Sequence, residues 1–146
     1  MIMSTRPNIL FLYSDQHNAR CLSSAGHPDV ITPNLDALVQ KGVHFKKAYT
    51  QSPVCTPSRM SMLSSLYPST FGYYGLYGRE PDFLMTSMMG HFAKHGYRTG
   101  VVGKIHTPRY WLEHDCQFIY DEFIEYPKYV EALGLYEKND GRNFSG

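Results

Sequence analysis

Apolar and polar positions along the chain form short apolar runs separated by amphipathic segments. Residues 8–14 (NILFLYS) are a nearly continuous apolar run, which is typical of a strand buried on both faces of a parallel sheet. Residues 43–50 (VHFKKAYT) and 97–104 (YRTGVVGK) have the composition of two further strands. The pattern therefore predicts three strands, with helical segments between them.

The helical segments carry recognisable start and stop signals. The first has Thr32 as its N-cap, Pro33 at its first position and Gly42 as its stop. Residues 58–66 and 87–96 repeat the helical spacing of apolar side chains. Strands that alternate with helices in this way predict βαβ crossovers, and thus an α/β fold with a mostly parallel sheet flanked by helices.

Residues 67–83 form a long connector rich in glycine, tyrosine and proline. A connector of this length inside a compact domain is usually functional. The connector contains Tyr73, Tyr74 and Tyr77. These three side chains, together with Trp111, are candidates for the wall of a pocket that binds an aryl, sugar or quaternary-ammonium group. Three strands are few for such a sheet, so we expect the domain to be incomplete in this chain.

The composition mainly excludes classes of partner and site. The 146 residues contain 42% hydrophobic residues and carry a net charge of +1, which gives no footprint for nucleic acid or an anionic membrane. No leader-like or membrane-spanning apolar stretch is present, so we expect a cytoplasmic protein. Three distant cysteines suggest no disulfide framework, and the spacing of His17, Cys21 and His27 matches no zinc motif.

Residues with useful chemistry follow the predicted strands. Asp15 and Gln16 come directly after the first strand and supply oxygen atoms of the kind that a hard divalent cation requires. Lys104 and His106 follow the third strand. Because ligands of open α/β sheets bind beyond the carboxyl ends of the strands, we expect these side chains to converge with Cys55.

The segment from Cys55 to Arg59 (CTPSR) precedes and opens a predicted helix. Thr56 or Ser58 could cap this helix, and Pro57 sits where a missing N–H has no cost. The free amides of a helix start attract anions, and Arg59 adds a guanidinium that binds paired oxygens. The combination predicts a site for a tetrahedral oxyanion.

The motif CTPSR resembles the Cys-x-Pro-Ser-Arg signature of the type I sulfatases, in the alkaline phosphatase superfamily. Four other segments fall in the same order as in that family: RPNILFLYSDQ, TPNLDALVQKGVHFKKAY, GYRTGVVGKIH and, loosely, CQFIYDEF. The resemblance covers about residues 6–123. It implies that residues 1–146 are the N-terminal portion of a sulfatase catalytic domain.

The resemblance also implies a sulfuric ester hydrolase with a defined site. Cys55 would be oxidised by a formylglycine-generating enzyme to formylglycine, whose hydrate is the nucleophile. Asp15, Gln16 and the modified Cys55 would hold Ca²⁺, with Mg²⁺ or Mn²⁺ as alternatives. Arg59 would orient the hydrate. Lys104 would neutralise charge on the sulfate, and His106 would bind or activate one hydroxyl.

Two alternatives stay open. Phosphonate or phosphate ester hydrolases of the same superfamily use similar sites, and the chain could also be an inactive fragment, because the family takes further cation ligands from later segments. The implied partners are a small sulfate ester and the modifying enzyme, with no nucleic acid or membrane. A homo-oligomer is left open.

Overall fold

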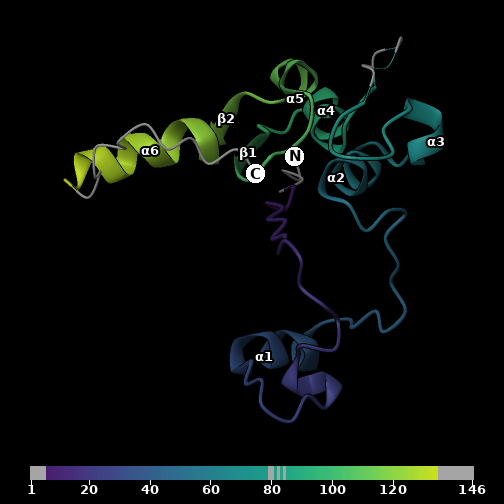
Figure 1. The fold of residues 1–146 in the computed structure, drawn as a ribbon, viewed down its shortest axis with the longest axis vertical. Helices are drawn as coiled ribbons and strands as arrows, with labels where there is room; N and C mark the ends of the chain where they lie inside the picture. Colours follow the sequence, from purple (N-terminus) through teal and green to yellow (C-terminus); the bar gives the residue numbers. More distant parts are fainter. Residues whose placement is uncertain (1–5, 79–80, 82, 84, 135–146) are drawn as a thin grey trace, which may run out of the picture. The chain divides into compact units, whose positions relative to one another are not determined.

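A computed structural model describes residues 6–78, 81, 83 and 85–134, and the chain divides into two compact units (Figure 1). Unit 1 extends to Tyr49, and unit 2 begins at Thr50. Unit 1 contains a short 3-10 helix, η1 (Ser23–Ala25), and the helix α1 (Pro33–Lys41). The other described helices and strands belong to unit 2.

The helix predicted after Thr32 is confirmed as α1. Thr32 occupies the N-cap position, and Pro33 is the first helical residue. Gly42 is the C-cap, and its N–H donates to the carbonyl oxygen of Leu38 at 2.9 Å. Proline at the start and glycine just past the end are thus read correctly from the sequence.

The carboxylate of Asp36 ties η1 to α1. It accepts hydrogen bonds from the Ser23 hydroxyl at 2.5 Å, from the Ser24 amide at 3.1 Å and from the Thr32 hydroxyl at 3.2 Å. The Thr32 hydroxyl therefore donates to Asp36 and accepts from the Ser23 amide at 3.0 Å, and it caps no amide of α1. The hydrogen bond from Ser23 is the main cause that lowers the pKa of Asp36 below its usual 3.8.

We expect Asp36→Asn to loosen α1 near neutral pH and to have no effect in acid. A carboxylate with a lowered pKa stabilises the folded state above pH 3.8, and this contribution disappears as the pH falls through the folded-state value. Hydrogen exchange of the α1 amides, compared with the wild type at each pH, measures the difference. Asp29→Asn, in the same unit, is the control. A deficit that persists in strong acid would contradict this role.

The two strands predicted in unit 1 are wrong for this structure. Residues 8–14 and 43–50 form no strand. Apolar side chains of both segments are exposed, including Leu10, Leu12 and Phe45. An apolar run becomes a strand only when neighbouring strands satisfy its backbone and covering elements bury its faces. The described part of unit 1 supplies neither.

Unit 2 contains a parallel pair of strands, β1 (Gly100–Gly103) and β2 (Phe118–Asp121). The register pairs Gly100 with Phe118 and Gly103 with Asp121. Helix α5 (Arg109–Asp115) connects the strands as a βαβ crossover. The parallel sheet with helices against it confirms the predicted α/β class, and β1 confirms the strand predicted at residues 97–104. The sequence did not predict α5 or β2.

Four more helices complete the described part of unit 2: α2 (Cys55–Ser64), α3 (Pro68–Phe71), α4 (Met88–Lys94) and α6 (Glu122–Ala132). The predicted helices at 58–66 and 87–96 correspond to α2 and α4, although α2 begins three residues earlier than predicted. Helix α3 lies within the connector. Across the part of the chain that the structure describes, no helix is long and apolar enough to cross a membrane.

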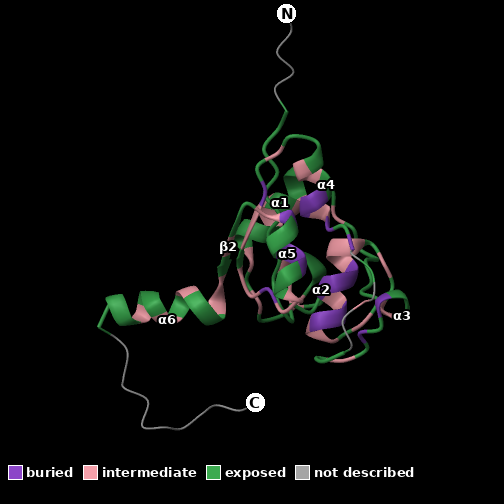
Figure 2. Cartoon of the chain, turned by 90° about the horizontal axis from the view of Figure 1, so that it is seen from above, coloured by how far each residue is buried: buried purple, intermediate pink, exposed green. Residues whose placement is uncertain are grey.

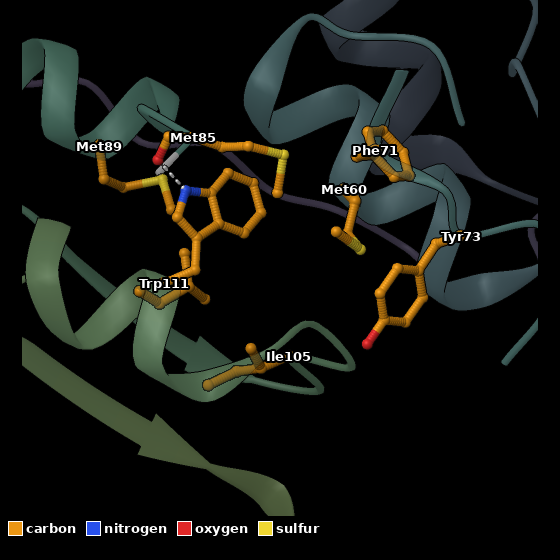
Figure 3. Packing of buried hydrophobic residues seen from close by; sticks show 8 residues of the cluster. Met60, Phe71, Tyr73, Met85, Met89, Ile105 and Trp111 are labelled. Carbon is orange, nitrogen blue, oxygen red and sulfur yellow. Dashed lines mark hydrogen bonds between the residues drawn. The ribbon is translucent and has the colours of Figure 1, made fainter. Parts of the chain in front are cut away.

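The core of unit 2 lies between α2, α4 and α5, where buried residues are concentrated (Figure 2). Met60, Trp111 and Leu112 are its most buried large side chains. The indole Nε1 of Trp111 donates to the carbonyl oxygen of Met85 at 2.5 Å (Figure 3). The predicted pocket role is therefore wrong for Trp111 and for the buried Tyr73, which both pack in the core.

A buried carboxylate fixes α4 against α5. Asp115 accepts a hydrogen bond from the Ser87 amide at 2.7 Å, and the Ser87 hydroxyl in turn caps the amide of Gly90. Burial raises the pKa of Asp115, but hydrogen bonds from Ser87 and His114 outweigh it and leave the pKa lowered. A side chain at position 90 would collide with this carboxylate, so only glycine fits there.

Candidate active site

Cys55 is the first residue of α2. Val54 before it has an extended backbone and provides no side-chain cap, so the first amides of the helix have no intrahelical acceptor. Pro57 falls in this first turn, where its missing N–H removes no helical hydrogen bond. Cys55 itself is half-buried at an end that carries partial positive charge.

The capping predicted for this helix is wrong. The Thr56 hydroxyl donates to the carbonyl oxygen of Leu76 at 3.4 Å, and the Ser58 hydroxyl pairs with that of Thr50 at 2.8 Å. Because α2 starts before both residues, neither can serve as its N-cap. The amides at the start of α2 are accordingly left for another acceptor.

Arg59 connects the first turns of α2 to the end of β1. Its side chain is only 7% exposed, and Nη1 donates to the carbonyl oxygen of Lys104 at 2.5 Å. Lys104 directly follows β1, so the structure brings two of the sequence-predicted site residues together at the carboxyl end of this strand. The Arg59 guanidinium thus lies at the carboxyl end of β1, the end at which ligands of parallel sheets bind.

The turn after β1 has an unusual backbone. Gly103 has a φ of +101°, and His106 has a φ of +45°, in the left-handed region that side chains other than glycine seldom adopt. The His106 ring stacks on Phe123, with 5.7 Å between ring centres. Strained residues of this kind tend to lie at functional sites, where the surroundings hold them in place.

Two buried polar atoms of this turn have no hydrogen-bond partner among the described residues. They are Nδ1 of His106 and the hydroxyl oxygen of Thr107. A buried polar atom without a partner costs about 1–3 kcal/mol, so such atoms normally meet a ligand, a water molecule or another part of the protein. The turn is therefore built to receive a polar group.

Sequence reasoning missed Thr107 and the ring of Phe123. Thr107 is adjacent to the predicted His106. Phe123 lies in the segment CQFIYDEF, where Asp121 at the end of β2 caps α6 by accepting from the Phe123 amide at 2.9 Å. The parallel register places Asp121 beside Gly103, and so brings Phe123 to the turn that holds His106. The sequence signal for Phe123 is its place in the segment CQFIYDEF.

Asp15 and Gln16 lie in an exposed turn of unit 1. Gln16 has a φ of +52°, so it shares with His106 a left-handed backbone. The convergence of Asp15 and Gln16 with Cys55 stays a prediction, because Asp15 and Gln16 belong to unit 1 and Cys55 belongs to unit 2. Within the described residues, no three histidine, cysteine, aspartate or glutamate side chains form a group that could hold a metal ion.

The three cysteines, Cys21, Cys55 and Cys116, are free thiols. Burial, with a smaller effect from the charge of Asp115, raises the pKa of Cys116 to about 11. That thiol is therefore inert near neutral pH, since the thiolate is the reactive form. Cys55 differs from it by its place at the start of a helix.

Comparison with known proteins finds related sequences. The family model described as Sulfatase matches residues 7–144. The chain is 35% identical to an ulvan-active sulfatase of Formosa agariphila over 140 residues, which are 84% of this chain and 27% of that protein. It is 34% identical to an arylsulfatase of Clostridium perfringens, over 70% of this chain and 21% of that protein.

A mammalian protein shows the same relation. Arylsulfatase A of Bos taurus is 36% identical over 111 residues, which are 68% of this chain and 21% of that protein. The chain thus spans roughly a quarter or less of the length of these curated relatives. Because the family model covers nearly all of its residues, the chain belongs to the sulfatase family.

Proposed function

We propose that this protein, at the length of its relatives, is a sulfuric ester hydrolase. The observation that carries the proposal is the family match over residues 7–144, which includes the CTPSR segment at the start of α2. The relatives are named as sulfatases that act on different esters, so the match supports the reaction and leaves the alcohol open.

Cys55 is the proposed nucleophile, after a formylglycine-generating enzyme, using an external oxidant, has oxidised its Cβ to an aldehyde with loss of the sulfur. One hydroxyl of the aldehyde hydrate attacks sulfur and releases the alcohol. The other hydroxyl then lets the sulfate leave by collapse back to the aldehyde. The half-buried position of Cys55 at a helix start supports this role, because the free amides there attract an anion.

Three side chains of unit 2 assist in this proposal. Arg59 is held by its bond to the Lys104 carbonyl, and orients the hydrate at the start of α2. The Lys104 ammonium neutralises charge that develops on the sulfate oxygens. His106 binds or activates one hydroxyl of the hydrate, and its buried Nδ1, without a partner among the described residues, is available for such a contact.

Asp15, Gln16 and the modified Cys55 are the proposed ligands of a divalent cation, with Ca²⁺ favoured over Mg²⁺ or Mn²⁺. A carboxylate and an amide oxygen suit a hard cation, and the two are adjacent in one exposed turn. When bound, the cation supplies positive charge against the sulfate oxygens. Calcium takes six or more oxygen ligands, so further ligands must come from beyond these three residues.

We also propose that residues 1–146 are the N-terminal portion of a larger catalytic domain. The chain covers 27% of the ulvan-active sulfatase that it matches. Apolar side chains of the segments 8–14 and 43–50, including Leu10, Leu12 and Phe45, are exposed within the described residues, which supports covering elements from elsewhere in a larger domain. The 146-residue chain by itself should then hydrolyse no ester.

Turnover of an aryl sulfate and an aryl phosphate tests the proposal. The full reading frame and the 146-residue chain would each be expressed with the modifying enzyme and assayed with Ca²⁺ and with a chelator. We expect sulfate turnover by the longer protein alone, abolished by the chelator. Faster hydrolysis of the phosphate ester would favour the phosphatase alternative. Metal-dependent turnover by the short chain would refute the incomplete domain.

A further inference from the structure

Residues 73–78, here called the 73–78 loop, are held in place at their first and last residues. Tyr73 packs in the core of unit 2. Gly78 lies against the Tyr73 ring so closely that an added Cβ would come within 2.8 Å of its Cγ. Only glycine allows this approach, because any side chain would displace the ring. The loop therefore folds back onto its own buried first residue.

The middle of the 73–78 loop is attached to the start of α2. The carbonyl oxygen of Leu76 accepts the hydrogen bond from the Thr56 hydroxyl at 3.4 Å. Thr56 is buried and is the residue next to Cys55. Since Leu76 is held at the first turn of α2, the residue that follows it must lie near the same helix start.

That following residue is Tyr77, which is 89% exposed. A large aromatic side chain left in water does not gain the stabilisation that its burial would contribute. Tyrosine has few rotatable bonds, so it presents a broad face at a small entropic cost on binding. An exposed tyrosine on an anchored loop beside a reactive residue is thus suited to ligand contact.

The other aromatic candidates fit this role less well. Tyr73 and Trp111 are buried in the core, and their faces are covered. Tyr74 is exposed, but it lies two residues before the attachment at Leu76. Tyr77 alone of these four directly follows the attached carbonyl.

We propose that Tyr77 is a specificity-determining residue whose ring contacts the organic group of the ester. This inference rests on the proposed function, which places the sulfate at the start of α2. The favoured alcohols carry a ring, aryl or sugar, because the tyrosine face can stack on an aryl ring or pack against the C–H face of a sugar ring. Ring-free alkyl sulfates make no such contact.

Kinetics of the full reading frame test the role of Tyr77. The substrates are an aryl sulfate, a monosaccharide sulfate and ethyl sulfate. We expect Tyr77→Ala to lower kcat/KM about 3- to 10-fold for whichever ring-bearing ester is preferred, mainly through KM, and to leave ethyl sulfate unchanged. Tyr77→Phe should keep the wild-type preference. Tyr67→Ala, an exposed tyrosine outside the loop, is the control.

The outcomes separate this inference from the function on which it rests. Wild-type turnover of any of the three sulfates supports the proposed function, independently of the kinetics of the Tyr77 variants. An equal loss on ethyl sulfate would make Tyr77 a merely structural residue and overturn the inference. No loss on any ester would also overturn it. If the wild type hydrolyses no sulfate ester, the proposed function and the inference fall together.

Discussion

On the proposed function, we expect Cys55→Ala to abolish sulfate ester turnover in the full-length protein, with a loss on the order of 10⁴-fold or more. Alanine cannot be converted to the proposed aldehyde, so no hydrate would form at the start of α2 and the proposed covalent step would be lost. The substitution removes a half-buried sulfur and leaves the helix intact, since α2 takes no cap from this side chain. Initial rates on an aryl sulfate measure the effect.

Cys21→Ala is the matched control, because Cys21 is also half-buried but lies outside α2. It should keep wild-type turnover. Peptide mass spectrometry supplies an independent measurement: the Cys55 peptide should lose one sulfur and two hydrogen atoms and gain one oxygen, while the Cys21 and Cys116 peptides keep their thiols. Activity retained by Cys55→Ala, or conversion of Cys21 in its place, would refute the assignment of the nucleophile.

Trp111→Ala should lower the free energy of unfolding by about 3–5 kcal/mol, the usual cost of removing a large core aromatic. Trp111 is only 1% exposed, packs in the cluster of α2, α4 and α5, and donates to the Met85 carbonyl. The substitution leaves both a cavity and a buried carbonyl oxygen without its donor. Urea unfolding followed by circular dichroism measures the loss.

Tyr110→Ala is the control for this prediction. Tyr110 is the neighbouring aromatic residue in the same helix, but it is exposed. Its replacement should change the free energy of unfolding by about 0.5 kcal/mol or less. Trp111 is the single tryptophan of the chain, so Trp111→Ala has no tryptophan fluorescence to follow. Circular dichroism can be used for the wild type and both variants. Equal stability of the two variants would show that the core does not depend on Trp111.

Local signals in the sequence predicted the elements that depend on local interactions. Proline and glycine at the ends of α1 define that helix without help from the rest of the chain. The strand around residues 100–103 was also found, because its β-branched residues lie between glycines. Helix α5 was missed: it is seven residues long and begins after a proline with no capping side chain.

Elements that depend on distant partners could not be predicted in this way. Residues 8–14 have the composition of a buried strand, but composition does not provide the neighbours that a strand needs. For the site, the rule that ligands bind at the carboxyl ends of strands anticipated that α2 and the end of β1 meet, as the bond from Arg59 to Lys104 shows. The length and aromatic residues of the connector 67–83 had already indicated a function, but they did not predict how its 73–78 loop is anchored, through the Thr56 hydroxyl and Gly78.

The raised pKa of Cys116 has a practical consequence for following maturation. With a pKa of about 11, this thiol is ionised in only about one molecule in 10⁴ near neutral pH. It therefore reacts very slowly with an alkylating probe. Of the three cysteines, that leaves Cys21 and Cys55 to be alkylated in the native protein. The proposed aldehyde at position 55 would not react with the probe, so conversion of Cys55 would lower the labelling stoichiometry from two towards one.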